Sequence, residues 1–137
     1  MPMNPDGGYI KLYRSILNWE WYTDLNTYRL FLHLLLRANY EPKKWRGRVV
    51  ERGQVVTGRL ALAQELKISE RAVRTALEHL KSTGEVTVES TSKYSVITIV
   101  NYAKYQDRPD ATDQQTDQQT DQQTDQQTDQ RPVTQPT

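Results

Sequence analysis

Residues 59–84 contain two short helical patterns, which are separated by a break at Lys67 and Ile68. In the second pattern, apolar residues recur at the i, i+3, i+4 and i+7 spacing of a helix that packs on one side. These residues are Val73, Ala76, Leu77 and Leu80. Ser69 precedes the pattern where an N-cap is favoured, and Gly84 follows it where a C-terminal glycine is common. The segment therefore predicts two helices joined by a tight turn.

Strand-forming residues flank this pair of helices on both sides. Segments 85–89 and 93–100 are rich in β-branched residues and are separated by a short polar turn, which predicts a hairpin. Short strands are also expected at residues 48–50 and 54–56, and the second of them could pair as the third strand of the sheet.

The most apolar segment is expected to form a helix over about residues 27–39. Its inward stripe consists of Leu30, Phe31, Leu34, Leu35 and Ala38. Asp24 or Asn26 can cap the start of this helix, and Thr57 can cap the following helix, which ends at Leu66. Leu32 and Leu36 widen the stripe, which predicts burial on more than one side of the helix.

The order of helix, short strand, helix, tight turn, helix and hairpin is that of a winged helix-turn-helix domain. Ala63 is small enough to let the two paired helices cross closely. Apolar residues that pack this pair together are Leu62, Leu66, Ile68, Val73 and Leu77. Lys67 lies in the turn, where φ is often positive, and a residue other than glycine there costs on the order of 1 kcal/mol. The predicted class is α+β, mainly α, with three core helices and a small antiparallel sheet that carries a wing.

Composition changes near residue 107. Residues 1–107 contain 47 apolar residues, or 44%, and only Ala111 and Val133 follow them. The TDQQ repeat that starts at Thr112 would place aspartates at i,i+4 spacing on a helix, where like charges repel. We therefore predict a winged-helix DNA-binding domain at 1–107 and a disordered acidic, polar tail at 108–137. The tail is interpreted as a linker without a specific role, or as a weak acidic competitor for the basic body.

Charge and residue types limit the possible functions. Residues 1–110 carry 17 Lys and Arg against 12 Asp and Glu, a net charge of +5, and the remainder carries −4. The chain has no cysteine, and no apolar run approaches the roughly 18 residues of a membrane span. His33 lies in the apolar helix and His79 is expected at the surface, so neither predicts a metal site or a catalytic dyad. We expect a cytoplasmic protein without enzymatic activity, cofactor or membrane contact.

The second of the paired helices presents side chains suited to DNA. The candidate DNA-binding residues are Arg59, Ser69, Arg71, Arg74, Thr75, Lys81 and Lys93. Arg71 and Arg74 lie in the first two turns of this helix, which a recognition helix presents to the major groove. Lys93 would reach a phosphate from the wing. Glu70 and Glu78 interleave with the arginines, so the alternative is a solvated face or a protein-contact surface.

Five segments within residues 8–106 carry a family resemblance. They are GYIKLYRSILNWEWYTD, FLHLLLRANYEPKKWRG, ERGQVVTGRLALAQEL, SERAVRTALEHLKSTGEV and SVITIVNYAKYQ. Together they resemble the N-terminal winged-helix domain of phage and prophage replication initiation proteins, the replisome organizers related to DnaD-like primosome proteins. The resemblance implies double-stranded DNA binding and homo-oligomer formation at a replication origin in a bacterial host cell. In that family a separate C-terminal domain usually binds single-stranded DNA and the helicase or its loader. Here the TDQQ tail follows Gln106 instead, so these contacts are not carried over by residue, and a helicase or loader stays an open partner.

The residues leave three functions open. The first is a non-enzymatic protein of phage or prophage DNA replication initiation that contacts double-stranded DNA through the predicted recognition helix and the wing. The second is a transcriptional regulator with the same fold. The third is a self-associating protein-interaction module without DNA contact, for which Trp19, Trp21 and Trp45 could supply an aromatic surface.

Overall fold

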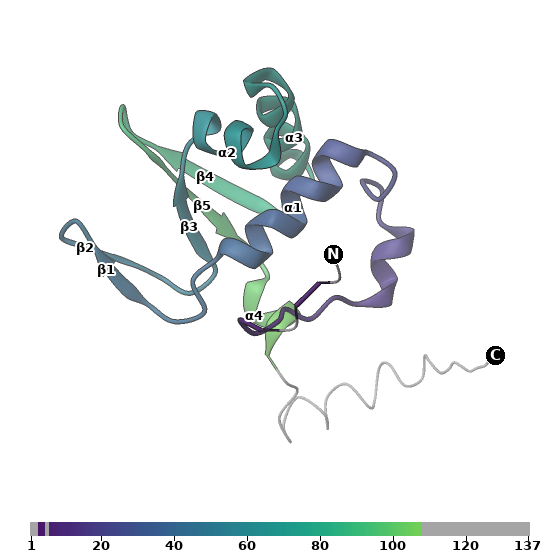
Figure 1. Ribbon diagram of the computed structural model, residues 1–137, viewed down its shortest axis with the longest axis horizontal. Coiled ribbons are helices and arrows are strands. Elements are labelled where there is room, and N and C mark those ends of the chain that lie inside the picture. The colour runs from purple at the N-terminus through teal and green to yellow at the C-terminus, as the bar shows by residue number, and fades with distance from the viewer. Residues whose placement is uncertain (1–2, 5, 108–137) are drawn as a thin grey trace. The chain divides into compact units, whose positions relative to one another are not determined.

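The computed structural model describes residues 3–4 and 6–107, and Figure 1 shows how their helices and strands are arranged. In chain order these elements are η1 (Arg14–Asn18), α1 (Leu25–Arg37), β1 (Lys43–Trp45), β2 (Arg48–Val50), β3 (Gln54–Thr57), α2 (Arg59–Leu66), α3 (Glu70–Ser82), β4 (Val86–Ser90), β5 (Ser95–Ile99) and α4 (Tyr102–Gln106). The predicted α+β class is confirmed. The expected disordered tail at 108–137 lies outside the described residues. Within those residues, no helix combines the length and the hydropathy that crossing a membrane requires.

The larger sheet has three antiparallel strands in the order β3-β5-β4. The central strand β5 pairs Ile97 with Val55 of β3, and Ile99 with Val86 of β4. The expected third strand is therefore confirmed. Side chains alternate between the two faces of a strand, so Ile97 and Ile99 share one face, where they belong to the hydrophobic core.

Helices α1, α2 and α3 pack on that face of the three-stranded sheet (Figure 1). Each contributes its predicted apolar stripe, except that α1 ends one residue before Ala38, which is only partly buried, and that Leu36 is exposed, so α1 is not buried on that side. The core residues from these helices are Leu30, Phe31, Leu34, Leu35, Leu62, Ala63, Leu66, Val73, Ala76, Leu77 and Leu80. Ala63 and the leucines beside it are buried between the helices, as expected for a close crossing of α2 and α3.

Side-chain caps fix where α1 and α3 begin. The side chain of Asp24 accepts a hydrogen bond from the backbone N–H of Thr27 at 3.1 Å, so α1 starts at Leu25, two residues before the predicted start. Ser69 caps α3 as predicted, because its hydroxyl oxygen accepts a hydrogen bond from the backbone N–H of Ala72 at 3.0 Å. Each cap satisfies one of the backbone donors that a helix start leaves unpaired.

The prediction that Thr57 caps α2 is wrong. Thr57 is the last residue of β3 and pairs with Ser95 of β5, so its position is fixed by the sheet. Gly58 is the N-cap residue of α2, and no side chain forms a capping hydrogen bond with the backbone at the start of this helix. The chain thus passes directly from strand to helix.

Left-handed residues shape the turns on either side of α3. Lys67 has φ 61° and ψ 46°, which confirms the positive φ expected between α2 and α3. Gly84 has φ 80°, and its N–H donates to the carbonyl of Lys81 at 3.1 Å. The N–H of Glu85 donates to the carbonyl of Leu80 at 2.9 Å, which completes a Schellman motif. Both turns redirect the chain within one or two residues.

Two elements were not expected from the sequence, and the first is α4. Tyr102 at its start is buried, and its Cβ lies so close to Gly53 that any side chain at residue 53 would collide with it. Gln106 at its end is also buried, and its amide bridges the backbone of Lys11 through hydrogen bonds of 2.8 and 3.0 Å. Helix α4 therefore ties the segment before η1 to the end of the body.

The second unexpected element is β1, which forms a hairpin with β2 and pairs Trp45 with Arg48, whereas β2 itself matches the strand expected at residues 48–50. Glu89 lies in β4, and Tyr94 directly precedes β5. Because side chains alternate along a strand, both side chains lie on the face of the larger sheet opposite Ile97. The ring of Trp45 meets that of Tyr94 edge to face at 4.9 Å, and Arg48 pairs with Glu89 at 3.8 Å. The β1–β2 hairpin therefore packs against the sheet from its helix-free side.

Candidate functional site

A groove of about 690 Å³ separates α3 from the tip of the β4–β5 hairpin. The start of α2 and Trp45 of β1 also line it. Four of the seven predicted DNA-binding residues lie along this groove, namely Arg59, Arg74, Lys81 and Lys93. They come from α2, α3 and the β4–β5 hairpin, so it is the packing of these three elements that brings them together.

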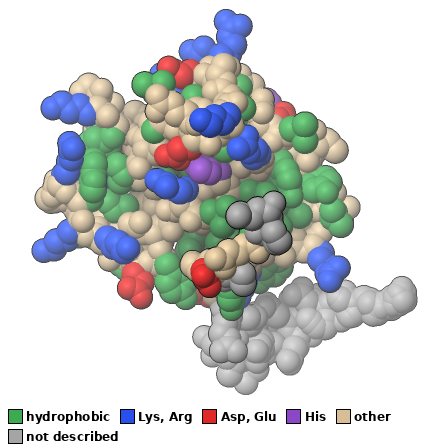
Figure 2. Space-filling model, viewed as in Figure 1, with side chains coloured by type: hydrophobic (Ala, Val, Ile, Leu, Met, Phe, Trp, Pro, Cys, Tyr) green, Lys and Arg blue, Asp and Glu red, His purple; other side chains and the backbone are tan. Residues whose placement is uncertain are grey.

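The lining of the groove has an excess of positive charge. Glu70 and Glu78 also line it, and Glu78 holds the ammonium of Lys81 at 3.1 Å. Arg59, Arg74 and Lys93 are exposed, and none of the three forms an ion pair with another residue of the described range 6–107. Figure 2 shows Lys and Arg side chains along the edge of the molecule that carries the two hairpins. Such a surface attracts polyanions.

The other three predicted residues line a different hollow. Ser69, Arg71 and Thr75 lie beside the start of α1, in a hollow of about 340 Å³ that Asp24 and Asn26 also line. Arg71 and Arg74 are both exposed and lie about one helical turn apart, yet they border different hollows. The structure therefore divides the predicted site into two groups on opposite sides of the exposed face of α3.

Each histidine has a carboxylate neighbour that the sequence did not reveal. His33 Nε2 lies 2.7 Å from a carboxylate oxygen of Glu65. His79 lies at the surface but is half-buried, because its ring stacks on Trp21 at 4.2 Å and its Nδ1 lies 3.3 Å from Asp24. These pairs lie apart from the groove. Among residues 3–4 and 6–107, no three His, Asp or Glu side chains are grouped closely enough to hold a metal ion.

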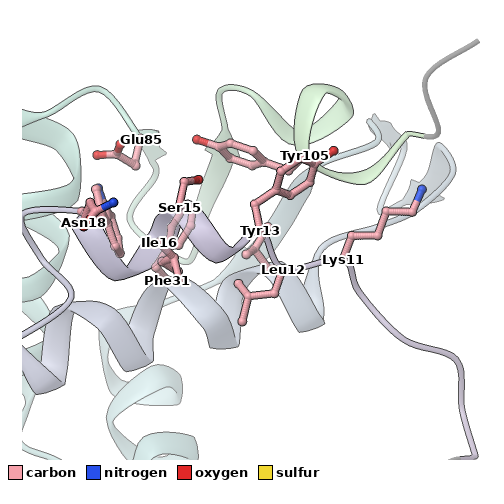
Figure 3. A pocket seen from close by; sticks show the side chains of 11 residues that line it. Lys11, Leu12, Tyr13, Ser15, Ile16, Asn18, Phe31, Glu85 and Tyr105 are labelled. Carbon is pink, nitrogen blue, oxygen red and sulfur yellow. The ribbon is translucent and has the colours of Figure 1, made fainter. Parts of the chain in front are cut away.

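A smaller, mainly apolar hollow of about 230 Å³ lies where the segment before α1 meets α1 and α4. Figure 3 shows its lining side chains, which include Ile16, Phe31 and Tyr105. Leu12 and Tyr13 at its border are about half exposed. None of the predicted DNA-binding residues lines this hollow.

The sequence reasoning missed the cations of the β1–β2 hairpin. Lys43, Lys44 and Arg46 are exposed, and Arg46 stacks over the ring of Trp45 at the border of the groove. The signal was present as the run KKWRGR, in which four of six residues are basic. Only its last residue, Arg48, falls within an expected strand, at residues 48–50.

Comparisons of the chain with protein-family models, with curated proteins and with solved structures gave no match.

Proposed function

We propose that the protein is a non-enzymatic, winged-helix DNA-binding protein that acts in the initiation of phage or prophage DNA replication. It contacts double-stranded DNA through α3 and through the β4–β5 hairpin, which serves as the wing. The observation that carries this proposal is the groove in which Arg59, Arg74 and Lys93 converge from three elements without an ion pair to any other described residue.

Each of these three cations has a distinct position relative to a duplex. Arg74 lies in the second turn of α3, where a guanidinium can form two hydrogen bonds to guanine O6 and N7 or bind a phosphate. Lys93 lies at the tip of the wing and Arg59 at the start of α2, where phosphates of the flanking backbone would be bound. Contacts on both sides of a recognition helix fix its orientation in the major groove.

The arrangement of elements supports the winged-helix assignment. Helices α2 and α3 are joined by a tight turn at Lys67, and Ala63 is buried where they cross. The hairpin of β4 and β5 follows α3 directly, and β3 completes the sheet. The replication role draws on the resemblance of residues 8–106 to replication initiation domains, and contacts with a helicase or its loader are not part of the proposal.

A salt titration of duplex binding tests the DNA contact. Fluorescence anisotropy with a labelled duplex should give a log of the association constant that falls linearly with the log of salt concentration. The slope is about −0.9 for each phosphate neutralised. Lys93→Ala should make that slope shallower by about 0.9. Lys104→Ala is the matched control, because Lys104 is an exposed lysine of α4 away from the groove, and its slope should equal that of the unchanged protein.

Two other functions give different results. Leu12, Tyr13 and Leu17 are exposed in the segment before α1, which supports a self-associating module. Such a module would show dimers or larger species by light scattering and no duplex binding at low salt, and that outcome would overturn our proposal. A transcriptional regulator would bind duplex DNA but would protect promoter sequences rather than origin repeats in a footprint.

A further inference from the structure

The β1–β2 hairpin concentrates positive charge outside the proposed contacts of α3 and the wing. Lys43, Lys44 and Arg46 are exposed, and within residues 6–107 none of them forms an ion pair. Figure 1 shows the hairpin projecting to the same side of the body as the tip of the wing. The hairpin therefore carries cations whose charge no carboxylate of the described body neutralises.

The turn of this hairpin has a strained residue at its tip. Arg46 has φ 49° and Gly47 has φ 78°, and these two residues form the loop between the paired Trp45 and Arg48. Two positive φ values in a two-residue loop define a type I′ turn, whose first position favours Asn, Asp or Gly. Arg46 occupies this first position, so it is held in a left-handed conformation that is unfavourable for arginine. A strained residue that the fold does not require is a reason to look for function.

The hairpin is fixed against the wing. Trp45 packs edge to face on Tyr94, and both rings line the groove. Arg48 pairs with Glu89 of β4, and a side-chain hydrogen bond with Tyr94 raises the pKa of Arg48 above its ordinary value. Two contacts of different kinds thus hold β1–β2 beside the tip of the wing. A positioned cation loses less conformational freedom on binding than one on a mobile loop.

Arg46 is held at the border of the groove. Its guanidinium lies 5.0 Å from the centre of the Trp45 ring, which itself lines the groove beside Lys93 and Tyr94. A cation over a ring face interacts with the electrons of the ring, so the N–H donors of the Arg46 guanidinium stay available for a second partner. A planar guanidinium with free edges is suited to bind a phosphate through two hydrogen bonds.

We infer that the β1–β2 hairpin is a second phosphate-binding arm, which extends the DNA contact beyond the wing with Arg46 as its principal residue. This inference rests on the proposed function, since it names further residues of the same DNA interface. Lys43 and Lys44 add charge to the arm. The ligand is the duplex backbone, so the contact is independent of base sequence.

The test compares two residues that share charge and backbone conformation. Lys67 is the other residue besides Arg46 in the described range that has positive φ and is not glycine, and it lies outside the groove. Asn favours this conformation, so R46N and K67N should each raise the Tm or leave it unchanged. R46N alone should weaken duplex binding, by about fivefold to tenfold at 0.1 M salt, and make the salt slope shallower by about 0.9.

The outcomes separate the inference from the proposed function. Equal affinities and equal salt slopes for R46N and K67N would overturn the second arm while leaving the contacts of α3 and the wing in place. No duplex binding by the unchanged protein would overturn both. R46K serves as a further variant, because it retains the charge but loses the planar fork of donors, so it should keep the salt slope of the unchanged protein while regaining only part of the affinity lost in R46N. A salt slope for R46K as shallow as that of R46N would overturn a phosphate contact.

Discussion

Helix α3 borders two hollows that differ in two ways. They differ in charge, and they differ in how many of their polar side chains already form hydrogen bonds or ion pairs within the protein. The groove toward the tip of the β4–β5 hairpin gathers Arg59, Arg74 and Lys93, which have no ion-pair partner within residues 6–107. In the hollow toward α1, Asp24 caps one helix and pairs with a histidine, and Ser69 caps the other helix. One side of α3 is therefore open to a ligand, and the other mainly maintains the fold.

This difference means that neighbouring arginines of one helix are not equivalent. Arg74 shares its hollow with two other unpaired cations, and their attraction for a polyanion adds together. Arg71 shares its hollow with the carboxylate of Asp24, which repels a phosphate. The predicted pair of recognition arginines is thus expected to act unequally.

The largest expected effect is a contrast between R74A and R71A. R74A should weaken duplex binding by at least about tenfold, since a guanidinium that contacts a base is worth about 1–3 kcal/mol of discrimination. R71A should weaken binding by less than about threefold. Both side chains are exposed, so neither change should alter the free energy of unfolding by more than about 0.5 kcal/mol. Anisotropy titrations at one fixed salt concentration measure the contrast.

Two outcomes would break the comparison. Equal losses for R74A and R71A would mean that the DNA covers both hollows. A larger loss for R71A would move the recognition surface toward α1. The thermal unfolding of both variants, followed by circular dichroism, serves as the control that the helices remain intact.

Much of the body could be predicted because its signals are local. The apolar period of α3, its cap at Ser69 and its terminal Gly84 lie within one short segment, and each was confirmed. The positive φ of Lys67 followed from the tight turn alone. The division of the site could not be predicted, because Arg71 and Arg74 share an exposed face and differ only in which neighbouring elements border them.

Strand β1, and with it the hairpin that it forms with the expected strand β2, was not predicted, for a physical reason. Type I′ turns are usually marked by Asn-Gly or Asp-Gly, whereas here the pair is Arg46-Gly47. Strand β1 has three residues, which is too short for an alternating pattern to appear. Its position depends on Trp45 and Tyr94, which lie far apart in the sequence and meet only in the folded chain.

A smaller effect is expected for S69A, which tests the structural character of the hollow toward α1. Loss of the cap on α3 should lower the free energy of unfolding by about 1 kcal/mol. Duplex affinity at a temperature where the protein is folded should be nearly unchanged. Denaturant unfolding and anisotropy measure the two quantities separately. Ser92→Ala at the exposed wing tip is the matched control and should change stability by less than about 0.5 kcal/mol.

A loss of affinity in S69A that exceeds the loss in its control would contradict this division. It would mean that the Ser69 hydroxyl binds DNA in addition to capping α3, as the sequence allowed. The salt slope would then show whether the lost contact is to a phosphate.

The smallest expected effect is a gain of affinity in E78Q, which tests the groove from its acidic side. Glu78 holds Lys81 at 3.1 Å and is itself well exposed, so its carboxylate both neutralises a cation and repels phosphates. Removing that charge should tighten duplex binding by about twofold to fivefold and steepen the salt slope by at most about 0.9. The lost i,i+3 pair should cost only about 0.2–0.5 kcal/mol of stability. Anisotropy titrations over a range of salt concentrations measure both changes.

Glu20→Gln provides the matched control, because Glu20 is exposed and lies outside both hollows beside α3. Its removal should leave affinity and salt slope within error of the unchanged protein. Weaker binding by E78Q on every duplex would show that Glu78 positions Lys81 for its phosphate. Weaker binding on one sequence alone would identify the carboxylate as an acceptor for cytosine N4, which would make Glu78 a base-reading residue. Either result would reverse the role assigned here to the acidic residues of the groove.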